Sequence, residues 1–87
     1  MVGQYKHPEP PHSIVEAVQY TKSNIKEVLE WGGEHVSPHD TLKIVLVSTQ
    51  AGTLIAFPDD YICKDSVYGF YPVMRHKFET QYVPVGE

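Results

Sequence analysis

The stretch IVEAVQYTKSNIKEVLEWGG, residues 14–33, changes its hydrophobic period half-way along. Its first seven residues are rich in β-branched and aromatic types, which predicts a strand. From Ile25 onward, apolar residues recur three and four positions apart until a glycine pair, which predicts an amphipathic helix of about two to three turns. Asn24, followed three residues later by Glu27, resembles a capping box at the helix start. A strand followed by one main helix indicates an α+β domain.

The chain after this helix predicts further strands. Residues 42–50, LKIVLVSTQ, are mostly apolar and indicate a central strand. Residues 51–57, AGTLIAF, are its expected hairpin partner, with Gly52 supplying the positive φ that such turns use. Pro58 and the acidic pair after it then predict a turn. Shorter extended segments are expected at 61–64, 70–73 and 81–85.

The C-terminal part adds a second, shorter helical element. Met74 and Phe78 lie four residues apart, the spacing that puts two side chains on one side of a helical turn. The predicted fold is therefore α+β, with one main amphipathic helix packed on an antiparallel or mixed sheet of about four to six strands, plus a short C-terminal helical turn. Three prolines among the first eleven residues favour a proline-rich extended N-terminal arm over residues 1–13, which leaves 14–87 as a single α+β domain.

Composition excludes several classes of partner. The 87 residues carry seven Lys and Arg against eleven Asp and Glu, a formal charge of −4, so nucleic acid is not an expected partner. The single cysteine, Cys63, cannot form an intramolecular disulfide, which fits a reducing compartment. The chain has no apolar run of roughly 18 residues and no recognisable signal peptide. We therefore expect a cytoplasmic protein with no membrane partner.

Candidate catalytic and metal-binding groups are few. His35 and His39 are four residues apart, but Pro38 lies between them and no third ligand is suitably spaced. Asp59 and Asp60 could form a catalytic carboxylate pair, although adjacent acids after a proline are more often turn residues. We therefore expect no catalytic residue, no metal site and no cofactor, in a protein that is not an enzyme.

The segment 68–77 offers chemistry for binding, because it combines aromatic rings with positive charge. Such a pairing can hold a nucleotide base and its phosphate, or a protein partner. The alternative is that these are ordinary strand residues and solvated charges. Trp31, at the helix end, is either a stacking platform or a core residue whose indole N–H needs a partner. The candidate contact residues are Tyr68, Tyr71, Arg75, His76, Lys77 and Trp31.

The order of these segments resembles a family of small proteins encoded by tailed bacteriophages and prophages. Its members carry Val-Ile-Glu-Ala-Ile-Gln-Trp, a short helix, and then Pro-Gly-Asp-Tyr-Ile, Gly-x-Phe-Tyr-Pro and Phe-x-x-x-Tyr. The resemblance covers residues 14–83, with Tyr20 in place of the usual tryptophan and Asp59 in place of the usual turn glycine. The matching residues are Glu16, Ala17, Gln19, Pro58, Asp60, Tyr61, Ile62, Gly69, Phe70, Tyr71, Pro72, Phe78 and Tyr82.

The resemblance implies a phage accessory protein that works in the cytoplasm of the host bacterium. It implies inhibition or evasion of a host system such as antiviral defence, by binding a host protein or by sequestering a nucleotide second messenger. A nucleotide pocket needs convergent basic groups, and a chain with seven basic residues would assemble one most easily as a homo-oligomer. The alternative is a structural, virion-associated or assembly module that uses edge-strand pairing. A small hydrolase is a third, less favoured alternative.

Overall fold

The computed structural model describes residues 2–85, which form eight strands, two α-helices and one short 3-10 helix. Residue 1 of the predicted arm and residues 86–87 of the predicted domain lie outside the described residues. The strands are β1 (Gly3–Lys6), β2 (Ile14–Gln19), β3 (Val36–Pro38), β4 (Val45–Thr49), β5 (Gly52–Ala56), β6 (Tyr61–Asp65), β7 (Gly69–Val73) and β8 (Val83–Pro84). The helices are α1 (Ile25–Gly32), the 3-10 helix η1 (Gly33–His35) and α2 (Arg75–Gln81).

The strands form two antiparallel sheets. The larger has the order β7-β6-β2-β1-β8 and the smaller the order β3-β4-β5. β4 is central in the smaller sheet, as its apolar sequence predicted, and β5 is its hairpin partner across a turn that ends at Gly52, whose φ is 112°. The α+β class, the main helix and the short C-terminal helix are confirmed. The division of the strands between two sheets was not evident from the sequence.

β1 lies within the proline-rich segment 1–13 that the sequence sets apart from the domain. It is extended, and it pairs with β2 on one side and with β8 on the other. The register places Gly3 opposite Ala17 and Lys6 opposite Ile14. The first and last strands of the described chain are therefore neighbours, and part of the N-terminal segment belongs to the sheet.

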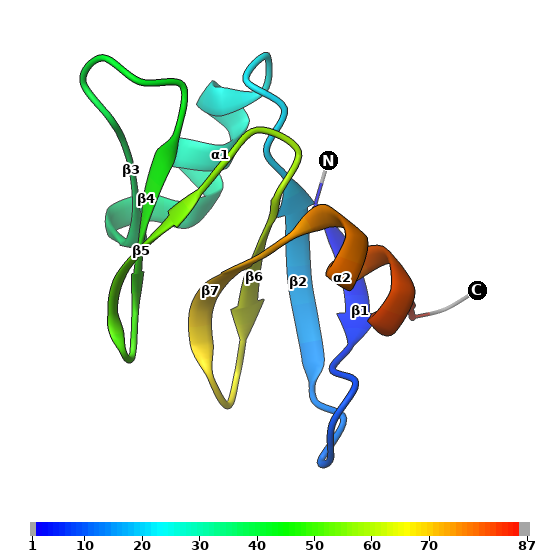
Figure 1. Ribbon diagram of the computed structural model, residues 1–87. Coiled ribbons are helices and arrows are strands. Elements are labelled where there is room, and N and C mark those ends of the chain that lie inside the picture. Colours follow the sequence, from blue (N-terminus) through cyan, green and yellow to red (C-terminus); the bar gives the residue numbers. More distant parts are fainter. Residues whose placement is uncertain (1, 86–87) are drawn as a thin grey trace.

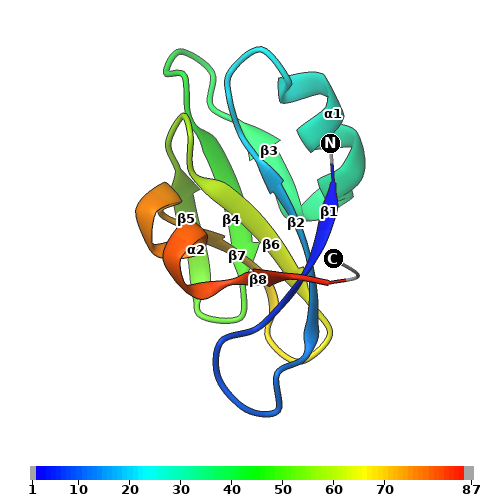
Figure 2. The same cartoon turned by 90° about the vertical axis from the view of Figure 1, so that its right-hand side faces the viewer.

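The two faces of the five-stranded sheet are covered by different elements. On one face, α1 and the three-stranded sheet enclose a core that includes Val18, Ile62 and Phe70. On the other face, α2 covers a second core that includes Cys63 and Phe78. Figures 1 and 2 show the two helices on opposite sides of this sheet. Because successive strand residues point to opposite faces, neighbours in one strand serve different cores.

α1 begins without the predicted capping box. Asn24 makes no side-chain capping bond to the helix. Its Oδ1 instead accepts from the Thr21 N–H at 3.0 Å, and its Nδ2 donates to the Gln19 carbonyl at 2.7 Å. The capping-box prediction is therefore wrong, because Asn24 closes the loop between β2 and α1. The predicted glycine stop is present: Gly33 has a φ of 59°, and its N–H donates to the Leu29 carbonyl.

The turn before β6 has a geometry that glycine usually supplies. The Asp60 N–H donates to the Phe57 carbonyl at 3.0 Å, with Pro58 in the second position, as in a type II turn. Asp59, in the third position, has a φ of 80°. The Asp60 carboxylate also accepts from the Phe57 N–H at 2.9 Å. The acidic pair therefore forms a turn, and Asp59 adopts the left-handed conformation that side chains disfavour.

Replacing Asp59 by glycine is expected to raise the free energy of unfolding by about 0.5 kcal/mol, because relief of left-handed strain outweighs the added unfolded-state entropy of glycine. The same substitution at Asp60 is the matched control. It should lower the free energy of unfolding, because it removes the carboxylate that holds the Phe57 N–H. Urea denaturation followed by circular dichroism measures both variants. Two losses of equal size would contradict the type II geometry.

Candidate functional site

One end of the molecule gathers three connections between strands. Figure 1 shows the β1–β2 loop, the β4–β5 turn and the β6–β7 turn at the lower end. A cavity of about 410 Å³ lies between the β1–β2 loop, β7 and α2, and is called the tyrosine cleft here. Its lining residues are His7, Pro8, Glu9, Tyr68, Tyr71, Pro72, Val73, Met74, Lys77, Gln81 and Tyr82.

Aromatic rings from separate elements form the walls of the tyrosine cleft. Tyr68 comes from the β6–β7 turn, Tyr71 from β7, and Tyr82 from the residue after α2. The His7 ring centroid lies 4.9 Å from that of Tyr68 and 5.7 Å from that of Tyr82. The hydroxyls of Tyr71 and Tyr82 are 3.1 Å apart and share a hydrogen bond. Tyr68 is exposed, so its ring is available to a ligand.

Polar groups complete the lining of the cleft. Lys77 and Gln81 are four residues apart on α2 and therefore share one side of the helix. Glu9 comes from the β1–β2 loop. The cleft thus combines an ammonium, an amide and a carboxylate with aromatic walls. This arrangement suits a planar ligand that is held by ring contacts and by one ion pair.

A buried carboxylate ties together two of the loops beside the cleft. Asp65, at the end of β6, is only 3% exposed. Its carboxylate accepts from the Ser13 hydroxyl at 2.9 and 3.0 Å, which links the β6–β7 hairpin to the start of β2. It also accepts from the Val67 N–H at 2.7 Å and from the Tyr68 N–H at 3.4 Å. Asp65 therefore positions the turn that carries Tyr68.

Burial keeps the hydroxyl and thiol groups around the cleft neutral. Burial, followed by the hydrogen bond with Tyr82, raises the pKa of Tyr71 well above its ordinary value. Burial likewise raises the pKa of Tyr82. Burial also raises the pKa of the Cys63 thiol to about 12. At neutral pH these groups offer hydrogen bonds and apolar surface, and Cys63 is not a thiolate nucleophile.

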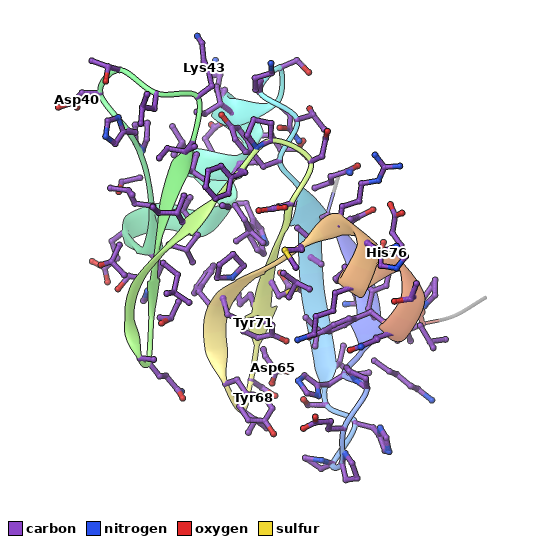
Figure 3. The ribbon with its side chains drawn as sticks, viewed as in Figure 1. Asp40, Lys43, Asp65, Tyr68, Tyr71 and His76 are labelled. Atoms are coloured by element: carbon purple, nitrogen blue, oxygen red, sulfur yellow. The ribbon has the colours of Figure 1, made fainter. Side chains whose placement is uncertain are left out.

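The structure brings three of the predicted contact residues together. Tyr68, Tyr71 and Lys77 all line the tyrosine cleft. Arg75 and His76 belong to α2 but do not line it. Arg75 Nε lies 3.5 Å from Glu79 Oε1 on the exposed surface of the helix. Figure 3 shows His76 on α2, well away from Tyr68 and Tyr71.

Trp31 lies on the opposite face of the five-stranded sheet. Its ring meets that of Phe70 edge-on, at 65° and with centroids 5.5 Å apart. Its Nε1–H donates to Glu16 Oε1 at 3.1 Å, the partner that a partly buried indole requires. Phe70 and Tyr71 are consecutive in β7 and face opposite sides of the sheet. Trp31 therefore packs against the core beside Phe70 and is not part of the tyrosine cleft.

Three residues at this end of the molecule were not among the contact residues predicted from the sequence. His7 lies among prolines, and only the pairing of β1 with the sheet brings it to Tyr68. Tyr82 follows Phe78 by four residues, and their stacked rings have centroids 4.5 Å apart. The four-residue spacing, which places two side chains on one side of a helix, was the sequence signal for Tyr82. Asp65 precedes a Ser-Val-Tyr-Gly turn, where an aspartate commonly accepts from backbone amides.

Comparisons with known proteins identify no relative. No family model, no curated protein and no solved structure matches the chain. Within residues 2–85, no group of three or more His, Cys, Asp or Glu side chains could hold a metal ion. In the same range no helix has the length and apolar character needed to cross a membrane. The geometry of the tyrosine cleft is therefore the main guide to function.

Proposed function

We propose that the protein is a non-enzymatic accessory binding protein of a bacteriophage. In this proposal it acts in the host cytoplasm and inhibits or evades a host system, such as antiviral defence, by holding a host component in the tyrosine cleft. The observation that carries the binding role is the convergence of rings from separate elements on one cavity that Lys77 also lines. The phage origin rests on the sequence resemblance of residues 14–83.

A nucleotide second messenger is the ligand class that best suits the cleft. Its volume of about 410 Å³ falls within the range of small-molecule pockets. The exposed ring of Tyr68 can stack on a base, and the Lys77 ammonium can pair with a phosphate. Lys77 is the single Lys or Arg among the lining residues. A ligand with two phosphates would therefore gain from a further cation supplied by a second copy.

A host protein is the second candidate, because the cleft is bordered by exposed apolar groups. Met74 lines the cleft and is 67% exposed, and Val67, next to Tyr68, is also exposed. Protein interfaces commonly centre on an aromatic or aliphatic anchor that enters such a pocket. A partner side chain inserted beside Tyr68 would bury these groups.

Several reactive side chains are already engaged in ways that favour binding over catalysis. Cys63 is buried, and its pKa of about 12 keeps the thiol protonated. Asp60 holds the turn before β6, and Asp65 holds the β6–β7 turn. These groups serve the fold, and the cleft offers aromatic surface in place of an activated nucleophile.

Native mass spectrometry of the protein recovered from phage-infected cells tests the nucleotide form of this proposal. We expect a bound mass in the nucleotide range that is released on denaturation. Affinity capture from the same lysate with wild-type protein and with Tyr68→Ala tests the protein form, and a partner that only the wild type retains would support it. A protein that holds neither ligand nor partner and is stoichiometric in purified virions would be structural, which would overturn the proposal.

Reversing the charge of Lys77 is expected to weaken nucleotide binding at least about ten-fold, because the ammonium is the cation of the cleft. The probes are cyclic mono- and dinucleotides, titrated by calorimetry into wild type, Lys77→Glu and Arg75→Glu. Arg75→Glu makes the same charge change on the same helix, but Arg75 faces Glu79 outside the cleft, so we expect less than about a two-fold effect. Equal weakening in both variants would contradict a specific role for Lys77.

A further inference from the structure

Four strands form the edges of the two sheets in the described part of the chain, and three of them carry a proline. β7 contains Pro72, β8 contains Pro84 and β3 contains Pro38. A proline has no backbone N–H to donate, which hinders the addition of another strand. β5 contains neither a proline nor a charged residue. Among the edge strands in residues 2–85, β5 is therefore the one that has neither a proline nor a charge to hinder pairing.

The surface of β5 is also apolar. Leu54 is 46% exposed, Ile55 is 45% exposed, and Phe57, just after the strand, is 56% exposed. No charged residue occurs from 44 to 58, although the chain carries a formal charge of −4. Natural edge strands usually carry a lysine, a proline or a bulge, which guards them against pairing with a strand of another molecule. An unguarded apolar edge is typical of a strand that a partner covers.

We propose that β5 pairs antiparallel with β5 of a second copy, which joins the two three-stranded sheets into one sheet of six strands. Antiparallel pairing of a strand with itself has two-fold symmetry, so each residue makes the same contacts in both copies. The uncharged segment 44–58 lets two molecules of charge −4 meet without like charges facing each other across the interface. β5 of a second copy thus offers β5 a row of backbone hydrogen-bonding groups, an apolar surface and no like charge.

The proposed interface adjoins the tyrosine cleft. A second cavity, of about 290 Å³, is lined by Leu54 of β5 and by three residues of the cleft, His7, Tyr68 and Tyr71. A second copy on β5 therefore lies beside this aromatic surface. The self-association rests on β5 alone and does not depend on the proposed function.

Sedimentation equilibrium of the full chain, from about 5 to 300 μM, tests the dimer. The average mass of the wild type should rise with concentration from 9.9 kDa toward twice that value. Ile55→Lys places a guarding charge on an exposed position of β5 and should raise the dimer Kd at least about ten-fold. Leu42→Lys is the matched control, because Leu42 is an exposed aliphatic residue in the β3–β4 loop. It should leave the dimer Kd unchanged, and circular dichroism checks that both variants fold.

Single cysteines introduced at Thr53, Leu54 and Ile55 locate the two-fold axis. Residues directly opposite in an antiparallel pair have Cα atoms roughly 4.5 to 5.5 Å apart, close enough for a disulfide under mild oxidation. Cys63 is buried and should not compete. Rapid cross-linking at one of the three positions is the expected result. A monomer at every concentration, a dimer that Ile55→Lys leaves unchanged, or the strand of another protein on β5 in place of a second copy would overturn the proposal.

Discussion

Phe78→Ala is expected to lower the free energy of unfolding by about 3 to 5 kcal/mol, the largest loss among the substitutions considered. Phe78 is the buried residue of α2 and is 2% exposed. Its ring stacks on Tyr61 at 4.0 Å and on Tyr82 at 4.5 Å, and meets Tyr5 edge-on at 4.8 Å. Truncation removes all three ring contacts and leaves a cavity beneath α2. Because α2 carries Lys77, the same change should open the tyrosine cleft.

Two controls separate this ring packing from general damage to α2. Phe78→Leu keeps an apolar side chain of similar size and should cost about 1.5 kcal/mol. Met74→Ala removes an exposed side chain just before the helix and should change stability by less than about 0.5 kcal/mol. Urea denaturation followed by Trp31 fluorescence and by circular dichroism measures all three variants. A loss below about 1 kcal/mol for Phe78→Ala would contradict the docking of α2 through this ring.

Asp65→Ala is expected to lower the free energy of unfolding by about 2 to 3 kcal/mol. Three donors lose a charged acceptor at once: the Ser13 hydroxyl and the backbone N–H groups of Val67 and Tyr68. The carboxylate is buried, so water cannot readily replace it. For a domain of this size, such a loss corresponds to a fall in melting temperature of roughly 10 °C or more.

Ser13→Ala is the control that separates the contribution of the Ser13 hydroxyl from that of the amides in the β6–β7 turn. It removes the hydroxyl that reaches Asp65 but leaves the bonds within the β6–β7 turn, so we expect a loss of about 1 kcal/mol. Asp65→Asn keeps an acceptor oxygen and should fall between wild type and Asp65→Ala. Thermal unfolding followed by circular dichroism ranks the variants. If Ser13→Ala and Asp65→Ala were equally destabilised, the turn amides would contribute nothing and the assigned role of Asp65 would be wrong.

The elements that the sequence predicted correctly are those with strong local patterns. Helix α1 follows from its apolar spacing and its glycine stop, and the β4–β5 hairpin follows from two apolar runs around Gly52. β1, with the sequence Gly-Gln-Tyr-Lys, and β3, with three residues ending in a proline, lack such patterns. They are strands because partners distant in sequence supply their hydrogen bonds, and no local window contains that information.

The candidate site, like the fold, could be predicted from the sequence only in part. Aromatic residues close to basic ones drew attention to Tyr68, Tyr71 and Lys77, which the structure brings together in one cleft. The sequence could not show that Arg75, two positions before Lys77, projects toward Glu79 and away from the cleft. Positions two apart on a helix point in widely different directions, so their roles depend on how the helix is docked. Phe78 sets that docking through its contacts with the sheet.

The sequence by itself determined the α+β class, the position of the main helix, the presence of a turn at Pro58 and the acidic pair, and the acidic, single-cysteine character of the chain. These features depend on backbone preference and on apolar period, which act over a few residues. Only the tertiary structure decided that the strands divide between two sheets, that His7 joins Tyr68 and Tyr82 around one cleft, and that β5 is left as the unguarded edge. Those outcomes depend on which distant strands pair and on which face of each strand is buried, and both are settled only when the whole core packs.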